Sequence, residues 1–209
     1  MDWLRRSLLS LCLLLLAGCG GGSPSPSTSG PGGTGEVLTW TRPSDPMGLA
    51  RQAGLTPDVK EHVDFHLHAH LDVFLNGRPV AVRGGIGIET TDPAVMKFSE
   101  DHFGGIPETG CAQVCISPLH THDVDGVIHM EAKSQAQFTL GQFFQEMAVR
   151  LDASCVDKFC APETTVVVYV NGQAQSGNPA DIVLGDLQEI AIVIGTPPEK
   201  IPDSFSGEA

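Results

Sequence analysis

The sequence predicts an α+β domain with a mixed or antiparallel β-sheet and one main helix. Two strand-like segments run directly into Asn-Gly pairs, at Asn76-Gly77 and Asn171-Gly172, and Asn-Gly between strands is the strongest short signal for a hairpin. Between these pairs, apolar residues recur at helical spacing after Thr139, a residue that can cap a helix. The order strand pair, helix, strand, turn, strand is typical of an α+β domain.

The N-terminal residues 1–18 are typical of an export signal peptide. Two arginines precede an apolar run at residues 8–17, which is about half of the roughly 20 residues that a membrane-spanning helix needs. The run ends in LAGC at residues 16–19, and this motif resembles the lipobox of bacterial lipoproteins. The resemblance implies that Cys19 becomes the lipidated first residue of the mature protein. An ordinary secretory signal with a chance cysteine is the alternative.

The lipobox resemblance also implies a location. The protein is expected in the cell envelope, anchored to a membrane by its N-terminal lipid and facing outside the cytoplasm. Gly20 follows the cysteine, and by the same resemblance this favours the outer membrane if the cell has one.

Composition divides the rest of the chain into a tether, one domain and a tail. Residues 19–36 hold the candidate lipidated cysteine and a stretch made almost entirely of Gly, Ser, Pro and Thr, which cannot bury enough apolar surface to fold. Residues 37–195 are the size of a single α+β domain with room for a core. The tail at 196–209 is rich in Pro and polar residues and is expected to lie loosely on the surface.

The first elements of the domain each have a local signal. A short helix is expected at 45–54. A strand is expected at 63–75, where apolar and polar residues alternate up to the first Asn-Gly pair, and RPVAV is its hairpin partner. Residues 93–118 are expected to be irregular because they contain paired glycines and several prolines.

The main helix is predicted over 139–151, the segment TLGQFFQEMAVRL. Its apolar residues fall on one side and are expected in the core rather than at a cofactor: Leu140, Phe143, Phe144, Met147 and Leu151. Strands TTVVVYV and EIAIVIG follow. The stretches VVVYVNGQ and LGDLQEIAIVIG are similar to the closing strands of β-grasp, or ubiquitin-like, folds, which implies a fold and no chemistry.

Charge and cysteine content bound the partners. The formal net charge is -13 at pH 7, and a chain without a basic face is not expected to bind nucleic acid. After signal removal, an even number of cysteines outside the cytoplasm predicts two disulfides. The local pairs Cys111 with Cys115 and Cys155 with Cys160 are favoured, because each would close a loop that lacks other regularity. The rival interpretation makes CAQVC a soft metal site or a redox pair.

One segment, EHVDFHLHAHLDVFLNG, holds four of the eight histidines. Successive side chains of a strand point to opposite faces of the sheet, so its alternation places a polar row opposite an apolar one. The polar row comprises His62, Asp64, His66, His68, His70 and Asp72.

A second histidine cluster lies in PLHTHDVDGVIHME. A tight hairpin centred on Asp125-Gly126 would pair His122 with His129. Opposed side chains share a face at about 4.5 to 5.5 Å, and imidazoles at that separation can turn two ring nitrogens onto one ion at about 2.0 to 2.1 Å. The patch on this face comprises His120, His122, His129 and Glu131.

The two clusters together predict a metal site, with His66, His68 and His70 as one wall and the hairpin patch as the other. The three histidines of the row span about 13 Å, so a single ion would use His68 with one neighbour and residues of the patch. Alternatively, two ions are bound, with Asp64 and Asp72 as ligands or as acceptors that orient imidazoles. Imidazole ligands without a thiolate set suit zinc or copper.

The blocks HLHAHLDVFLNG and LHTHDVDGVIHMEA, followed by FTLGQFF, resemble uncharacterised exported bacterial proteins that share these His-rich blocks. The resemblance implies that the blocks belong together, and it implies no activity.

These features predict an envelope-anchored lipoprotein that binds zinc or copper through a His-rich sheet face, for storage, delivery or protection. One alternative is a zinc metalloenzyme, in which three histidines leave a position for water and Glu131 or Asp123 acts as general base; no known catalytic motif supports it. The other is a binding or scaffolding module without metal, whose histidines sense pH because their usual pKa lies near 6.5. The sequence names no protein partner.

Overall fold

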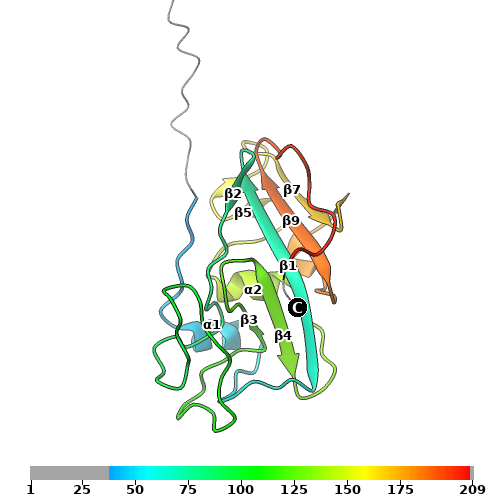
Figure 1. Cartoon of the computed structure of the whole chain (residues 1–209). Helices are drawn as coiled ribbons and strands as arrows, with labels where there is room; N and C mark the ends of the chain where they lie inside the picture. Colours follow the sequence, from blue (N-terminus) through cyan, green and yellow to red (C-terminus); the bar gives the residue numbers. More distant parts are fainter. Residues whose placement is uncertain (1–37, 208–209) are drawn as a thin grey trace, which may run out of the picture. The chain divides into compact units, whose positions relative to one another are not determined.

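Residues 38–207 are the part of the chain that the computed structural model describes (Figure 1). The predicted signal peptide, Cys19 and the tether lie outside these residues. The described chain has a mixed β-sheet and two α-helices, which agrees with the predicted α+β class.

A seven-stranded mixed sheet forms the centre of the fold. Strand β1 (Phe65–Leu75) pairs antiparallel with β4 (Val127–Ala132) on one side and parallel with β9 (Gln188–Ile194) on the other. The shorter strands are β2 (Arg78–Val80), β3 (Leu119–His120), β7 (Val166–Val170) and β8 (Gln173–Ala174), and a separate two-stranded sheet contains β5 (Cys155–Val156) and β6 (Phe159–Cys160). The path through the main sheet is β3-β4-β1-β9-β7-β8, and β2 pairs with the end of β1.

Both predicted Asn-Gly turns are present. Asn76 and Gly77 have φ angles of 50° and 76°, and Asn171 and Gly172 have φ angles of 47° and 74°. Positive φ at both central residues defines the type I′ turn, which matches the twist of the flanking strands. These turns join β1 to β2 and β7 to β8.

The helices are α1 (Pro46–Gln52) and α2 (Leu140–Glu146), with a 3₁₀ turn at Pro179–Asp181. Thr139 caps α2 as predicted, because its side chain accepts from the backbone N–H of Gln142 and the Gln142 side chain accepts from the backbone N–H of Thr139. The helix ends before the predicted Leu151, since Ala148 has a left-handed φ of 54°. The two α-helices are equally long, so a single main helix is not confirmed.

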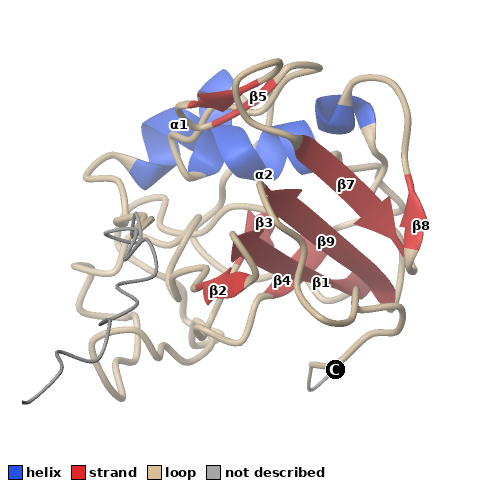
Figure 2. Ribbon diagram, turned by 90° about the horizontal axis from the view of Figure 1, so that it is seen from above, coloured by secondary structure: helices blue, strands red, loops and turns tan. Residues whose placement is uncertain are grey.

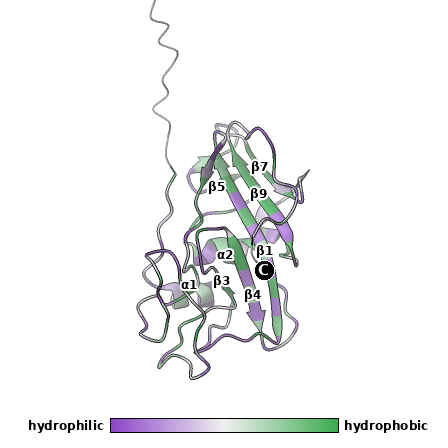
Figure 3. Ribbon diagram, viewed as in Figure 1, coloured by the Kyte–Doolittle hydropathy of each residue, from purple (hydrophilic) through white to green (hydrophobic). Residues whose placement is uncertain are grey.

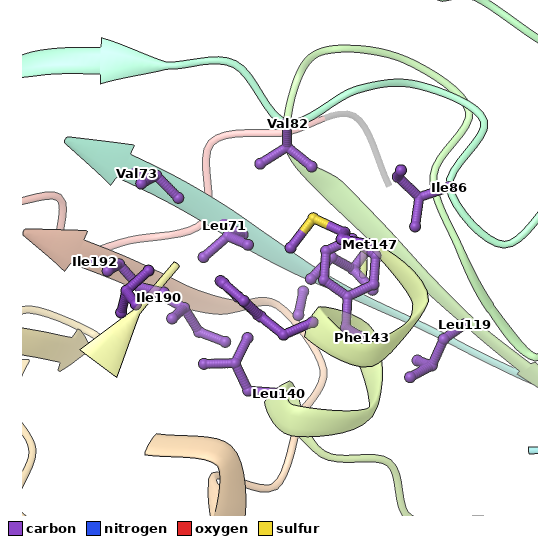
Figure 4. Close-up of a cluster of buried hydrophobic side chains, with 14 of the residues drawn as sticks. Leu71, Val73, Val82, Ile86, Leu119, Leu140, Phe143, Met147, Ile190 and Ile192 are labelled. Carbon is purple, nitrogen blue, oxygen red and sulfur yellow. The ribbon is translucent and has the colours of Figure 1, made fainter. Parts of the chain in front are cut away.

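One face of the sheet packs against the helices. Figure 2 shows α1 and α2 on the same side of the sheet. Alternate residues of β1 and β9 are buried with the apolar side of α2, and Figure 4 shows this core with Leu71, Val73, Leu140, Phe143, Ile190 and Ile192. Burial of this apolar surface is the main driving force for folding. The opposite face of β1 and β4 is thereby left for polar residues, and Figure 3 shows hydrophilic segments on both strands.

The C-terminal tail contacts the polar face of the sheet. The Phe205 ring lies edge-on to the His70 ring at 6.1 Å between centroids, and Ser206 Oγ lies 3.3 Å from His70 Nδ1. Two residues of the tail therefore contact the polar row of β1.

Both local disulfides are present. Cys111 is bonded to Cys115 and Cys155 to Cys160, which confirms the favoured pairing. The CAQVC segment is therefore not a thiolate site in this structure, and residues 38–207 contain no free thiol.

Candidate metal centre

The pairing of three strands brings the histidines of both clusters onto one sheet face. His66 of β1 lies opposite Glu131 of β4, and His68 lies opposite His129. His120 of β3 lies opposite His129 on its other side. Because directly opposed residues share a face, the two segments predicted as walls of a site become neighbours in one sheet.

The predicted register of the hairpin centred on Asp125-Gly126 is wrong by two residues. His129 pairs with His120, not with His122, and residues 121–126 form a longer loop in place of a tight turn. Other partners hold this loop: the Thr121 carbonyl accepts from Gly85 N, and the His122 carbonyl accepts from Phe103 N. A shift of two residues leaves every side chain on its original face, so the predicted patch survives.

Loops cover the buried side of the cluster. His120 has no exposed surface, and a side chain at Gly87 would overlap the Leu119 carbonyl oxygen and press on His120. Gly87 also has a φ of 69°, which favours glycine. The loop that contains Gly87 can therefore approach β3 closely only because this residue is glycine.

One set of donor atoms forms between β1 and β4. His66 Nε2 lies 3.5 Å from His129 Nδ1 and 3.2 Å from Glu131 Oε1. His129 Nδ1 lies 4.0 Å from the same Glu131 oxygen. These three atoms form a closed triangle, and the ring of His68 lies beside both histidines, 4.5 Å from the His66 centroid and 4.6 Å from the His129 centroid.

A second set of donor atoms forms between β3 and the chain before β1. His120 Nε2 lies 3.2 Å from His122 Nε2, and His122 Nε2 lies 3.8 Å from Glu61 Oε1. His120 Nδ1 lies 3.0 Å from the Ser117 carbonyl, which can only accept, so Nδ1 carries the proton and Nε2 keeps its lone pair. A backbone acceptor that fixes the tautomer in this way is typical of metal-binding histidines.

Several groups of these side chains are compatible with metal binding. In each, the ligand atoms lie within 4.8 Å of one another, and the groups are His66, His68 and His129; His120, His122 and His129; and Glu61, His120 and Glu131. Glu61 was not predicted. It precedes the regular part of β1, where alternation no longer indicates which face a side chain joins, so the sequence carries no signal for it.

The buried histidines of the cluster are neutral near pH 7. Burial, followed by the neighbouring His122, His68 and His66, lowers the pKa of His129 to about 3. Burial lowers the pKa of His122 to about 4, and it holds the pKa of His120 well below the usual value. A neutral imidazole offers a lone pair to a metal, whereas these three histidines are poorly suited to sensing pH near 6.5.

Glu131 is a carboxyl group without sufficient partners. Its side chain is 5% exposed, and its Oε2 and the Oε1 of Glu61 are buried without hydrogen-bond partners. Burial and then the charge of Glu61 raise the pKa of Glu131 to about 7. A buried carboxylate is costly unless a cation or donor compensates it, and a bound metal ion would do so.

His70 and Asp72 lie apart from this cluster, in a separate group with Glu189 whose ligand atoms are also close enough to hold a metal ion. His70 Nε2 lies 2.7 Å from the Asp125 carbonyl oxygen, and Nδ1 lies 3.0 Å from both carboxyl oxygens of Glu189. Burial lowers the pKa of His70, but the hydrogen bond and charge of Glu189 outweigh it and raise the pKa above its usual value. His70, Asp72 and Glu189 form a separate group, in which both nitrogens of His70 already have partners.

The remaining members of the polar row are also outside the cluster. His62 Nε2 lies 3.0 Å from Asp58 Oδ2, and Asp64 belongs to none of the described groups that could hold a metal. The alternation in the sequence therefore predicts a polar row that is too long at its N-terminal end, because the strand begins only at Phe65.

A cavity of about 170 Å³ opens beside the cluster. Glu61 and Glu131 line it together with Asp58, His62 and Lys133. Lys60 also lines it. Lys133 Nζ lies 2.7 Å from Asp58 Oδ2 and Lys60 Nζ lies 3.4 Å from Glu108 Oε2, so neither lysine is paired with the two glutamates.

No protein-family model matches the chain, no curated protein is similar to it in sequence, and no solved structure matches its fold. The fold and the cluster define it as an α+β domain with two disulfides and a histidine and glutamate cluster compatible with metal binding. The β-grasp likeness of the C-terminal half stays a prediction. Within residues 38–207, no helix is long and apolar enough to span a membrane.

Proposed function

We propose that this protein is an envelope-anchored lipoprotein that binds a transition-metal ion, zinc or copper, through the cluster on its polar sheet face. The observation that carries the proposal is the close approach of ring nitrogens from four histidines of the cluster to one another and to Glu131. Without an ion, such an arrangement buries lone pairs that have few donors. With an ion, the same lone pairs become ligands.

The spacing of the donor atoms supports this function. Four ligands at about 2.0 to 2.1 Å around a tetrahedral zinc ion lie about 3.3 to 3.4 Å from one another. Six neighbouring pairs of nitrogen and oxygen atoms in the cluster lie 3.2 to 4.0 Å apart, so small side-chain movements suffice to close the site.

The chemistry of the donors supports zinc or copper. Imidazole suits both metals, whereas sites built only from carboxylates and carbonyls suit magnesium or calcium. The described cysteines are all in disulfides, and Met130 is buried in the core on the opposite face. The ligands are therefore nitrogen and oxygen atoms, not sulfur.

The envelope location rests on the N-terminal sequence and on the disulfides. LAGC at residues 16–19 resembles a lipobox, and disulfides persist in oxidising compartments outside the cytoplasm. In that setting, a tethered metal-binding domain would store, deliver or sequester the ion.

A zinc metalloenzyme is the second candidate, and the cavity beside the cluster is the observation that favours it. Glu131 lines this cavity and has a pKa of about 7, which is suited to a general base. An open coordination position would distinguish this candidate. In the cobalt-substituted protein, added azide would shift the visible spectrum if a position is open and would leave it unchanged if the protein supplies every ligand.

Elemental analysis of the full-length chain tests metal binding. The purified protein should contain zinc or copper, or take it up when it is added, and the double variant His122→Ala, His129→Ala should not. His102→Ala is the matched control, since His102 is half exposed and lies in none of the groups that could hold a metal. A metal-free wild-type chain that also fails to bind added zinc and copper would favour the non-metal binding module.

A further inference from the structure

We propose that the cluster is a dinuclear centre, in which the Glu131 carboxylate bridges two metal ions. This inference rests on the proposed function and extends it from one ion to a coupled pair. It follows from the number of donors, from their division into two sets and from the position of Glu131 between them.

The cluster contains more donors than one ion can use. A tetrahedral zinc site has four ligands. Seven side chains of the described chain contribute to the groups that share members with Glu131 or His129: Glu61, His66, His68, His120, His122, His129 and Glu131. A single ion would leave about three of them buried or half-buried without a role.

The donors can be divided into two sets by the elements that carry them, with His129 within reach of both. The first set comes from β1 and β4 and consists of His66, His68 and His129, with 3.5 Å between His66 Nε2 and His129 Nδ1. The second set comes from β3 and the flanking loops and consists of His120, His122 and Glu61, with 3.2 Å between His120 Nε2 and His122 Nε2. Each set supplies three ligands and lacks a fourth.

Glu131 is placed to supply the fourth ligand to both sets. Its Oε1 lies 3.2 Å from His66 Nε2 in the first set and 3.8 Å from His120 Nε2 in the second. Its Oε2 is buried without a hydrogen-bond partner. A carboxylate has two oxygens with about four lone-pair sites, so Glu131 can bind both ions, as in two-metal sites with ions about 3.5 to 4 Å apart.

The charge of the site agrees with two ions. Glu61 and Glu131 each have a buried carboxyl oxygen without a hydrogen-bond partner, and the two lysines that line their cavity, Lys60 and Lys133, are paired with Glu108 and Asp58. Two divalent ions would stabilise both carboxylates in their ionised form.

The second ion would also face the cavity, because Glu61 and Glu131 both line it. This places the ion where a small ligand from solvent, such as water or an inorganic anion, can reach it. The first ion, between β1 and β4, has no ligand other than Glu131 among the residues that line this cavity.

Copper(II) loading of the full-length chain tests the dinuclear centre. We expect two copper ions per chain by elemental analysis after removal of excess metal. Because one carboxylate bridges them, their spins should couple, so that the electron paramagnetic resonance signal integrates to much less than the copper present. His102→Ala should behave as the wild type.

Variants then separate the two sets. His66→Ala with His68→Ala, and His120→Ala with His122→Ala, should each reduce the content to one copper with an uncoupled signal that accounts for all of it. Glu131→Gln should abolish the coupling. These substitutions change side chains only. Even where a variant fails to fold, the copper content and the spin coupling of the wild type test the dinuclear centre.

The possible failures are distinguishable. A wild-type chain that binds one copper with a full, uncoupled signal would overturn the dinuclear centre and leave the proposed function intact. Two coppers with a full signal would overturn the Glu131 bridge. A chain that binds no copper and no zinc would overturn the proposed function and this inference together.

Discussion

His129 is the residue on which most of the cluster depends. It pairs with His68 on one side and His120 on the other, and it belongs to two of the groups that could hold a metal. Replacing it removes a ligand and leaves neighbouring donors without their central member. We expect His129→Ala to weaken zinc binding by about 100-fold or more, beyond the 10- to 100-fold effect of outer-shell partners, as measured by competition with a chromophoric chelator.

His102→Ala provides the comparison for this measurement. Equal zinc affinities for the two variants would show that the cluster on the sheet face is not the binding site.

At the residue scale, sequence alternation predicted the cluster only in part. His66, His68 and His129 follow the period of two and lie where it places them. His70 follows the same period but is hydrogen-bonded to Glu189, a residue more than a hundred positions away. The sequence does not indicate that the strand of Glu189 pairs with the strand of His70. Glu61 joins the cluster from irregular chain, and no periodicity predicts such a position.

At the element scale, α2 contains a titratable group in the core. Glu146 is completely buried, and burial raises its pKa well above the usual value. Because the pKa of Glu146 is raised in the folded state, its protonated side chain makes a contribution to stability that is fully present below pH about 4.3. This contribution is lost as the pH rises toward the raised pKa. Over that range the loss is about 1.4 kcal/mol for each pH unit.

We therefore expect Glu146→Gln to be more stable than the wild type at pH 8 and nearly equal to it at pH 4. Urea unfolding at the two pH values measures this difference. The exposed Glu163→Gln variant removes the same charge and should change stability little at either pH. A Glu146→Gln variant without any gain at high pH would show that Glu146 ionises in the folded protein at little cost.

The two disulfides should differ in their effect on the metal centre. Cys111 and Cys115 belong to a small second core under the loops, and Cys111 N donates to the Val59 carbonyl close to Glu61. Removal of either disulfide by a double Ala substitution should lower the free energy of unfolding by about 2 kcal/mol for loops this short. Only loss of Cys111–Cys115 should also weaken zinc binding, because it loosens the chain that carries Glu61.

Cys155→Ala with Cys160→Ala is the matched variant for this test, since β5 and β6 are not part of the cluster. Chemical denaturation and zinc titration of both double variants give the comparison. Weaker zinc binding in the Cys155 and Cys160 variant alone would contradict the assigned role of the loop.

The elements with local signals were predicted best. Both Asn-Gly hairpins, the Thr139 cap and the short disulfides depend on neighbouring residues and are present. Features that depend on distant partners were not predicted: the parallel pairing of β1 with β9, and the register of β3 against β4. In that hairpin, hydrogen bonds from Gly85 and Phe103 override the turn that Asp125-Gly126 alone would favour.

At the scale of the whole molecule, the proposed lipoprotein combines a metal-binding domain with a lipid anchor. We expect the full-length chain expressed in a bacterial host to fractionate with membranes and Cys19→Ser to appear in the soluble fraction, because a lipid anchor requires the cysteine of the LAGC motif. Both proteins should bind the same amount of zinc. Membrane association that persists in Cys19→Ser would contradict lipidation at this residue.

Identifying the ligands of the bound metal tests most directly the central claim that the polar sheet face is a metal centre. X-ray absorption spectroscopy of the zinc-loaded full-length chain should show only nitrogen and oxygen ligands at about 2.0 to 2.2 Å, with the multiple scattering of several imidazoles. A zinc ion with sulfur ligands at about 2.3 Å, or one without imidazole scattering, would contradict the account, because the cluster of His66, His120, His129 and Glu131 could not then be the site.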